Sequence, residues 1–249
     1  MEYKHLNESV NIKTIEEDAY KGVFEVEGLY TGYGLTVGNA LRRTLLSSLP
    51  GAAVTQIKIN NVPHEFSTLP GVKEDMVQLG LNFKQLRFRM HTDELQTLEL
   101  HVKGEQTITG ADIKTNSEVE IMNPEIELAH LTAKSAEITI EIQVERGLGY
   151  SAVEARKSEK KLAIGAIALD AMFTPVTTVN YTVDSMRVGE RTDFDRLRLE
   201  IETDGTISPS SALHKASNIL KDHFEKVSNV TPQEFEVAVE TKKKKTSKK

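Results

Sequence analysis

The stretch Gly32-Tyr-Gly-Leu-Thr-Val-Gly-Asn-Ala-Leu-Arg-Arg-Thr-Leu-Leu-Ser-Ser-Leu-Pro-Gly51 decides how the chain folds. The two glycines at its start predict a tight turn, and Thr36 is placed to cap the helix that follows. Pro50 and Gly51 predict the end of that helix. At 100° per residue, one face of the helix gathers the side chains expected to pack against a core, which are Val37, Leu41, Thr44, Leu45 and Ser48.

The opposite face of this helix carries Asn39, Arg42, Arg43 and Leu46. Glu, Lys or Gln would be usual on a face that met only water, whereas arginine beside an apolar residue is favoured in the cores of protein interfaces. A single leucine on a solvated basic face is also common. The residues alone therefore leave two interpretations open, a protein-binding face and a plain solvent face.

The composition is that of a soluble globular protein, with 39% hydrophobic and 27% charged residues in a chain of 249. The absence of cysteine excludes disulfides and cysteine-ligated zinc, and it suits a reducing cytoplasm. The N-terminus has no apolar core of a signal peptide, and the longest apolar run, residues 162–169, is too short to span a bilayer. We therefore expect a cytoplasmic protein with no membrane partner.

Charge is distributed unevenly along the chain. The formal net charge is −6, and because six lysines fall within residues 242–249, the remaining residues carry −12. A body this acidic lacks the electrostatic footprint of a DNA-binding module. Residues 233–249 are expected to form a flexible lysine-rich tail, which either makes weak non-specific contacts with phosphates or only adds solubility.

Strand patterns dominate the middle of the chain. Period-two alternation of apolar residues predicts strands around residues 23–28, 53–60, 86–90, 98–102 and 138–144, with a return strand at 62–66. Further strands are expected at residues 176–183 and 197–201. A helix is expected over residues 72–85, where apolar residues recur at helical spacing, and the charge-alternating residues 151–161 are expected to form a mobile loop.

A second long helix is predicted near the end of the chain. Ser208 followed by Pro209 is a strong N-terminal signal, since serine caps a helix and proline suits its first position. An apolar stripe extends from there to about residue 228 and consists of Ala212, Leu213, Ala216, Ile219, Leu220, Phe224 and Val227. The stripe must cover either the protein's own sheet or a second copy of the chain, and helical spacing alone does not decide between them.

This layout predicts an α+β fold made of two domains. Residues 1–50 and 168–232 form a discontinuous dimerisation domain of sheet plus helices, and residues 51–167 form an inserted, strand-rich domain.

Familiar catalytic and cofactor-binding patterns do not fit. Gly32, Gly34 and Gly38 follow a strand and precede a helix, but the third glycine is one position too late for a dinucleotide-binding fingerprint. The seven histidines include no H-x-x-x-H pair, and no G-x-S-x-G motif is present. Adjacent Glu74 and Asp75 suit the first turn of a helix better than an acid–base pair. We therefore expect no catalytic residue, cofactor or metal in this chain.

Several blocks of the sequence resemble the N-terminal part of the alpha subunit of bacterial-type RNA polymerase. They occur in that family's order and span roughly residues 10–228, which is far more specific than any single motif. The blocks are Gly38–Arg43, His64–Thr68, Gly71–Asp75, Leu81–Lys84, Arg146–Tyr150, Arg191–Asp195 and Ile201–Ile207.

This resemblance implies a homodimeric scaffold that nucleates assembly of the beta and beta-prime subunits of DNA-directed RNA polymerase, a nucleotidyltransferase, while contributing no catalytic residue itself. Omega and sigma would complete the complex, which is cytoplasmic and associated with the nucleoid. The family's roles map onto three groups of residues in this sequence. Beta binding maps to Asn39, Arg42, Arg43 and Leu46, beta-prime binding to Lys84, Leu169 and Asp170, and dimerisation to Leu213, Ala216, Ile219, Leu220, Phe224 and Val227.

The sequence departs from the family in two places. Residues 155–161 are basic where some members carry an acidic activator-contacting loop, so that role is not expected here. The residues after Thr231 leave no room for the family's usual C-terminal DNA-binding domain, so DNA is expected to be contacted only indirectly. The alternative function is a nucleic-acid-binding or structural protein that acts through its basic tail.

Overall fold

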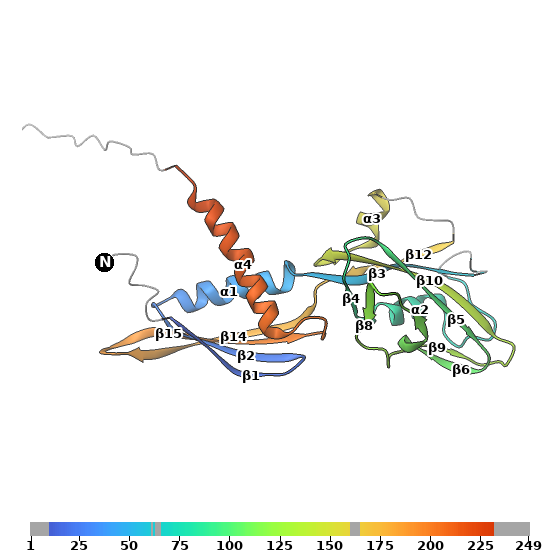
Figure 1. Cartoon of the computed structure of the whole chain (residues 1–249), viewed down its shortest axis with the longest axis horizontal. Coiled ribbons are helices and arrows are strands. Elements are labelled where there is room, and N and C mark those ends of the chain that lie inside the picture. The colour runs from blue at the N-terminus through green and yellow to red at the C-terminus, as the bar shows by residue number, and fades with distance from the viewer. Residues whose placement is uncertain (1–9, 61, 63–65, 160–164, 232–249) are drawn as a thin grey trace, which may run out of the picture.

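The computed structural model describes residues 10–60, 62, 66–159 and 165–231, and it has the α+β fold expected from the sequence. The lysine-rich segment 233–249 lies outside these residues. Two main sheets lie at opposite ends of an elongated molecule, and α1 and β3 lead from one to the other (Figure 1).

The first sheet has the strand order β1-β2-β15-β14 and is antiparallel throughout. Its strands come from the two ends of the described chain, which are β1 (Asn11–Glu17), β2 (Lys21–Leu29), β14 (Val176–Val188) and β15 (Arg191–Thr203). Helices α1 (Tyr33–Ser47) and α4 (Pro209–Ser228) cover one face of this sheet (Figure 1). The buried residues between them, among them Phe24, Leu45, Leu199 and Ala212, form the core of this part of the molecule.

The second sheet is strand-rich, with the order β7-β5-β10-β3-β4-β8, and β12 also pairs with β3. Its strands are β3 (Pro50–Ile59), β4 (Phe88–Met90), β5 (Gln96–Lys103), β7 (Ile113–Lys114), β8 (Val119–Ile121), β10 (Glu137–Leu148) and β12 (Ala166–Ala168). The smaller elements around it are β6 (Gln106–Thr109), β9 (Glu127–Leu131), β11 (Tyr150–Ser151), β13 (Ala171–Met172), the 3-10 helix η2 (Gly110–Asp112), α2 (Met76–Phe83) and α3 (Val153–Glu159).

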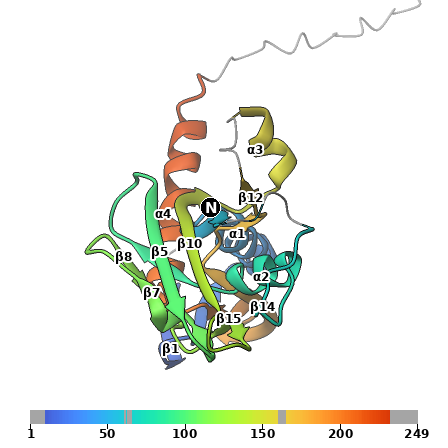
Figure 2. The same cartoon turned by 90° about the vertical axis from the view of Figure 1, so that its right-hand side faces the viewer.

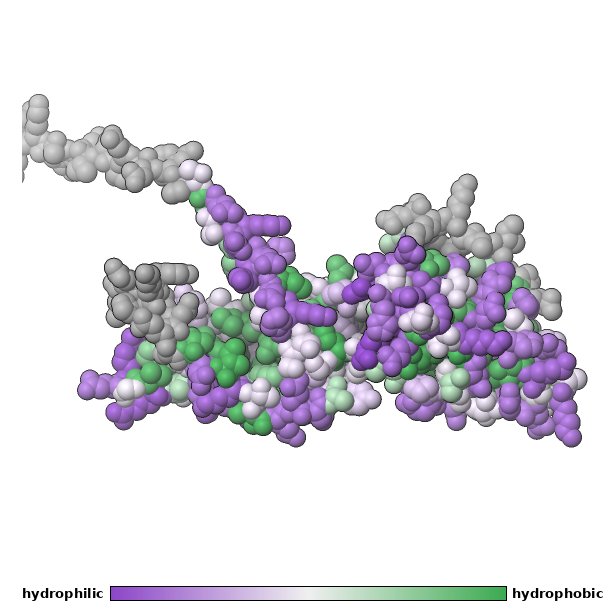
Figure 3. Space-filling view, in the orientation of Figure 1, coloured by the Kyte–Doolittle hydropathy of each residue, from purple (hydrophilic) through white to green (hydrophobic). Residues whose placement is uncertain are grey.

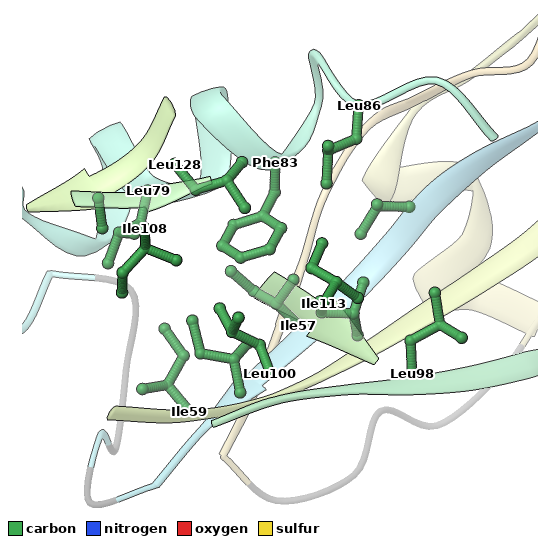
Figure 4. Close-up of a cluster of buried hydrophobic side chains, with 14 of the residues drawn as sticks. Ile57, Ile59, Leu79, Phe83, Leu86, Leu98, Leu100, Ile108, Ile113 and Leu128 are labelled. Carbon is green, nitrogen blue, oxygen red and sulfur yellow. The ribbon is translucent and has the colours of Figure 1, made fainter. Parts of the chain in front are cut away.

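The alternation predicted for residues 138–144 is confirmed by β10, whose isoleucines and Val144 are buried on one face. Figure 4 shows Leu79 and Phe83 reaching down from α2 toward Ile57 and Leu100 of the sheet. Each such fully buried side chain contributes roughly 1.5–3 kcal/mol. The helix therefore closes the apolar face that β10 and its neighbours present.

Three local predictions are wrong. Residues 153–159 form α3 rather than a loop. The described ends of the predicted return strand, Val62 and Phe66, belong to no strand, and residues 63–65 lie outside the described part of the chain. The helix expected from residue 72 begins only at Met76, because the Asp75 side chain accepts a hydrogen bond from the Gln78 amide at 2.7 Å and caps it there.

The predicted Thr36 cap is also wrong, since the N-cap of α1 lies four residues earlier. Gly32 is the N-cap, with φ of 86°, a left-handed conformation that glycine adopts without strain. Thr36 instead donates its hydroxyl to the Gly32 carbonyl at 3.3 Å, within the helix. By contrast, Ser208 caps α4 as predicted, accepting a hydrogen bond from the Ser211 amide.

Candidate functional site

Two glycines of helix α1 face the first sheet and leave no room there for a side chain. A Cβ atom at Gly38 would lie 2.8 Å from Tyr181 Cδ2 and 2.9 Å from Leu197 Cδ1. A Cβ atom at Gly34 would lie 2.6 Å from Val183 Cγ1. All three distances are too short for real contacts, so glycine at these positions lets the helix backbone rest directly on β14 and β15.

The faces of α1 are arranged largely as the sequence predicted. Leu41, Thr44 and Leu45 are buried against the sheet, which confirms the core face. Asn39, Arg42 and Arg43 are exposed, although Arg42 also reaches the edge of the sheet. Leu46 differs from the prediction, because it is half-buried against the cluster shared with α4.

The two arginines of this face differ in their surroundings. Arg42 Nε donates to the carbonyl oxygen of Val179 at 3.3 Å, which fixes the side chain against β14. Arg43 is exposed close to the C-terminal end of the helix, and its carbonyl oxygen accepts the Ser47 hydroxyl at 2.8 Å. Arg43 is therefore the residue of this group that a partner can reach most directly.

A second candidate surface brings together Lys84, Leu169 and Asp170, which are far apart in the sequence. Lys84 Nζ lies 3.5 Å from Asp170 Oδ2 at the edge of a groove of about 300 Å³. The exposed apolar side chains Val77 and Leu81 of α2 line the same groove. An apolar groove with an ion pair at its edge can accept an apolar side chain of a partner and orient it.

Two features hold the groove in shape. The Val153 amide donates to Asp170 Oδ1 at 3.0 Å. This hydrogen bond, together with Lys84, lowers the pKa of the Asp170 carboxyl below its usual value, although burial acts in the opposite direction. Asp170 therefore stays charged at neutral pH. Gly80 of α2 leaves room for Leu169, because a Cβ atom there would lie 2.9 Å from Leu169 Cδ2.

The apolar stripe of α4 is divided between two environments. Ala212 and Ala216 are fully buried, and Leu213, Ile219 and Leu220 are half-buried. Further along, Phe224 and Val227 are 66% and 68% exposed. Figure 2 shows the second half of α4 projecting away from the rest of the fold. The stripe thus covers its own sheet with its first half and leaves its second half bare.

More apolar surface lies on the same part of the molecule. Figure 3 shows hydrophobic residues gathered beside α4, over α1 and the first sheet, whereas the visible face of α4 is mostly hydrophilic. Tyr33 and Leu35 of α1 are 44% and 61% exposed. Contiguous apolar surface of this kind on a soluble protein usually marks a binding site for another protein.

Two carboxylates have roles that the sequence did not predict. Glu74 was expected in the first turn of a helix, and this is wrong, because α2 begins at Met76 and Glu74 lies outside it. Glu74 is only 7% exposed and accepts hydrogen bonds from the His130 amide at 2.8 Å and the His130 ring at 2.6 Å. Asp195 Oδ2 accepts the amides of Gly32 and Gly34 at 2.8 and 3.0 Å. Both pairs join segments far apart in the chain, which no local spacing reveals.

The described residues show no arrangement typical of a metal site or a membrane span. In the ranges given above, no three His, Cys, Asp or Glu side chains lie close enough together to hold a metal ion. None of the described helices is both long and apolar enough to cross a lipid bilayer.

Comparison with known proteins links most of the chain to one family. Residues 57–174 match the family described as "RNA polymerase Rpb3/RpoA insert domain". The "DNA-directed RNA polymerase subunit alpha" of Symbiobacterium thermophilum is 47% identical over 234 residues, covering 93% of this chain and 74% of the relative. The subunit of the same name from Oenococcus oeni is 45% identical over 213 residues, covering 86% of this chain and 68% of the relative.

Proposed function

The chain belongs to the family of DNA-directed RNA polymerase alpha subunits, and from this membership we propose that it is the homodimeric scaffold on which the two large subunits of that polymerase assemble. The observation that carries the proposal is 47% identity to a named alpha subunit over 93% of the chain. The relatives support this function and give no support to the alternative of a nucleic-acid-binding protein that acts through a basic tail.

The beta subunit would dock on the exposed face of α1. Arg43 would make a charge-assisted hydrogen bond with an acidic group of beta, supported by Asn39 and Arg42 beside it. Leu46 would contribute through its exposed part only, because the rest of this side chain packs toward α4. The accessibility of Arg43 supports this assignment.

Beta-prime would use the groove beside α2. Its contact residues would be Lys84, Leu169 and Asp170, and their proximity in the structure supports treating them as one site. Leu169 is only 8% exposed, so it would shape the floor of the groove while Lys84 and Asp170 meet the partner at its edge.

The second copy of the chain would cover the bare half of the α4 stripe. Phe224 and Val227 would then be buried against the partner, while Ala216, Leu213, Ile219 and Leu220 would mainly hold α4 on its own sheet. We also propose residues 1–50 and 168–232 as the dimerisation domain and residues 51–167 as the inserted domain. The two largest apolar clusters, one on each main sheet, are separate and support this division, except that Leu169 packs in the cluster of the second sheet.

Capture of the large subunits tests the proposed function. Arg43→Ala should leave a folded dimer that captures beta about 30-fold or more weakly, because truncating a buried, paired arginine costs roughly 2–5 kcal/mol at an interface. Arg187→Ala, which removes an exposed arginine of β14, is the matched control and should capture beta normally. Normal capture by Arg43→Ala would show that α1 is not the docking surface.

A further inference from the structure

The proposed docking helix has no capping group of its own. Its N-cap is Gly32, which has no side chain, and its first turn contains no acidic residue. The first amides of any helix have no carbonyl partner within the helix and need one from elsewhere. In α1, the Tyr33 amide donates to the Tyr30 carbonyl oxygen at 2.9 Å, so a local turn satisfies only one of them.

A carboxylate from the neighbouring strand supplies the missing cap. Asp195 of β15 accepts the amides of Gly32 and Gly34 with the same oxygen. A negative charge at this end of a helix is also favoured by the helix dipole. The carboxylate can approach because residue 34 is glycine, since a Cβ atom there would lie 3.0 Å from both Asp195 Cβ and Asp195 Oδ2.

The residues around Asp195 secure the turn that it caps. Thr31 Oγ1 donates to the carbonyl oxygen of Asp193. The Arg191 guanidinium donates to both carboxylate oxygens of Asp193 and lies 5.2 and 5.1 Å from the ring centroids of Tyr30 and Phe194. The block Arg191–Asp195 therefore holds the segment from Tyr30 to Gly34 at several points.

We propose that Asp195 is a positioning residue, which fixes the start and direction of α1 and so presents the Asn39–Arg43 face to the beta subunit without touching it. This inference rests on the proposed function. It accounts for a sequence block, Arg191–Asp195, whose residues lie on β15 and outside every assigned contact surface. Asp195 acts through the helix, because the amides that it accepts, those of Gly32 and Gly34, lie about three turns before Arg43.

The first arm of the test measures hydrogen exchange of the first-turn amides of α1 and needs no partner protein. Asp195→Ala should speed exchange of these amides by about 2- to 30-fold, the range expected for loss of a helix cap. Asp195→Asn, which keeps an acceptor oxygen but loses the charge, should give an intermediate effect. Asp93→Asn, which affects an aspartate paired with Arg146 of β10 in the other sheet, is the matched control and should leave α1 unchanged.

The second arm measures capture of beta by the 249-residue chain. Asp195→Ala should weaken capture about 3- to 10-fold, and adding Thr36→Glu, which restores a negative charge in the first turn, should recover part of both losses. Ile57→Val, a mild core change in the other sheet, is the control for general loss of stability. If Asp195 is a positioning residue, Ile57→Val should capture beta normally. If capture depends only on overall stability, Ile57→Val should weaken it too.

The outcomes separate this inference from the proposed function. The positioning role is overturned if Asp195→Ala leaves hydrogen exchange unchanged. It is also overturned if Asp195→Ala speeds exchange but captures beta normally, while Arg43→Ala fails to capture it. Normal capture by Arg43→Ala overturns the docking surface itself. A loss of capture in Ile57→Val as large as that in Asp195→Ala would reduce the effect to general stability and also refute positioning.

Discussion

Replacing Phe224 with aspartate is the sharpest test of dimerisation. Phe224 lies on the projecting half of α4 and is 66% exposed in the single chain, so it contributes little to the fold. The substitution places a charge at the centre of the bare stripe. A charge buried there without a partner would oppose association strongly.

The expected loss follows from the area that Phe224 has left to bury. Complete burial of a phenylalanine is worth roughly 1.5–3 kcal/mol, and about two thirds of that remains available here, or about 1–2 kcal/mol. A two-fold dimer contains each residue twice, which gives about 2–4 kcal/mol. At 1.4 kcal/mol per tenfold, the dissociation constant should rise about 30- to 700-fold before the cost of the charge is added.

Light scattering across a dilution series measures this effect, with circular dichroism as the check on folding. The wild-type protein should have twice the mass of one chain at micromolar concentration, and Phe224→Asp should have the mass of one chain with unchanged helix content. Asn218→Asp adds the same charge to an exposed position on another side of α4 and should remain dimeric. A monomeric wild type, or a dimeric Phe224→Asp, would refute the reasoning.

Two further substitutions test the fold that carries these surfaces. Gly38→Ala should lower the free energy of unfolding, measured in urea, by up to about 2 kcal/mol. Overpacking against the sheet costs roughly 1–3 kcal/mol, which outweighs the gain of about 1 kcal/mol in helix propensity. Thr36→Ala on the exposed side should be neutral, and a more stable Gly38→Ala would contradict the close packing of α1. Burial alone would raise the pKa of Glu74, but hydrogen bonds from the His130 amide and ring outweigh burial and lower this pKa in the folded state. The ionised carboxylate therefore stabilises the fold fully above the ordinary glutamate pKa. This stabilisation is lost as the pH falls through the lower folded-state pKa. Glu74→Gln should therefore lower the free energy of unfolding by roughly 1.5–3 kcal/mol at pH 7 and by progressively less below pH 4. Glu127→Gln changes an exposed neighbour of the same histidine and should have little effect at any pH. An equal loss in Glu74→Gln from pH 7 to pH 3 would argue against this assignment.

Features that depend on local periodicity could be predicted from the sequence. The alternation in β10 and the Ser208–Pro209 start of α4 are visible because neighbouring residues alone determine them. Strand β1 was not predicted, and the reason is physical. All seven of its residues are exposed, so no buried face imposes an apolar alternation on it.

Features that depend on distant residues could not be predicted. Thr36 looked like a cap because the true cap, Asp195, lies more than 150 positions away in the sequence. The sequence predicted a turn at Gly34 and showed Gly38 only as the misplaced third glycine of a dinucleotide-binding pattern. The reason for glycine at both positions lies in their contacts with β14 and β15. The grouping of Lys84 with Asp170 came only from the family resemblance, since no spacing rule joins two residues 86 positions apart.

The packing of Leu46 connects the two proposed roles of this part of the molecule. Leu46, Leu213 and Ile219 are partly buried against the same apolar cluster, so α1 and the first half of α4 stabilise each other. The second half of α4 does not share this cluster and remains bare. A partner that buries the second half would hold the first half in place as well, because both belong to one continuous helix. Dimerisation would thereby stiffen α1 from the side of α4, while Asp195 fixes it from the side of the sheet. A scaffold that must present Arg43 to a large subunit would therefore be most effective as a dimer.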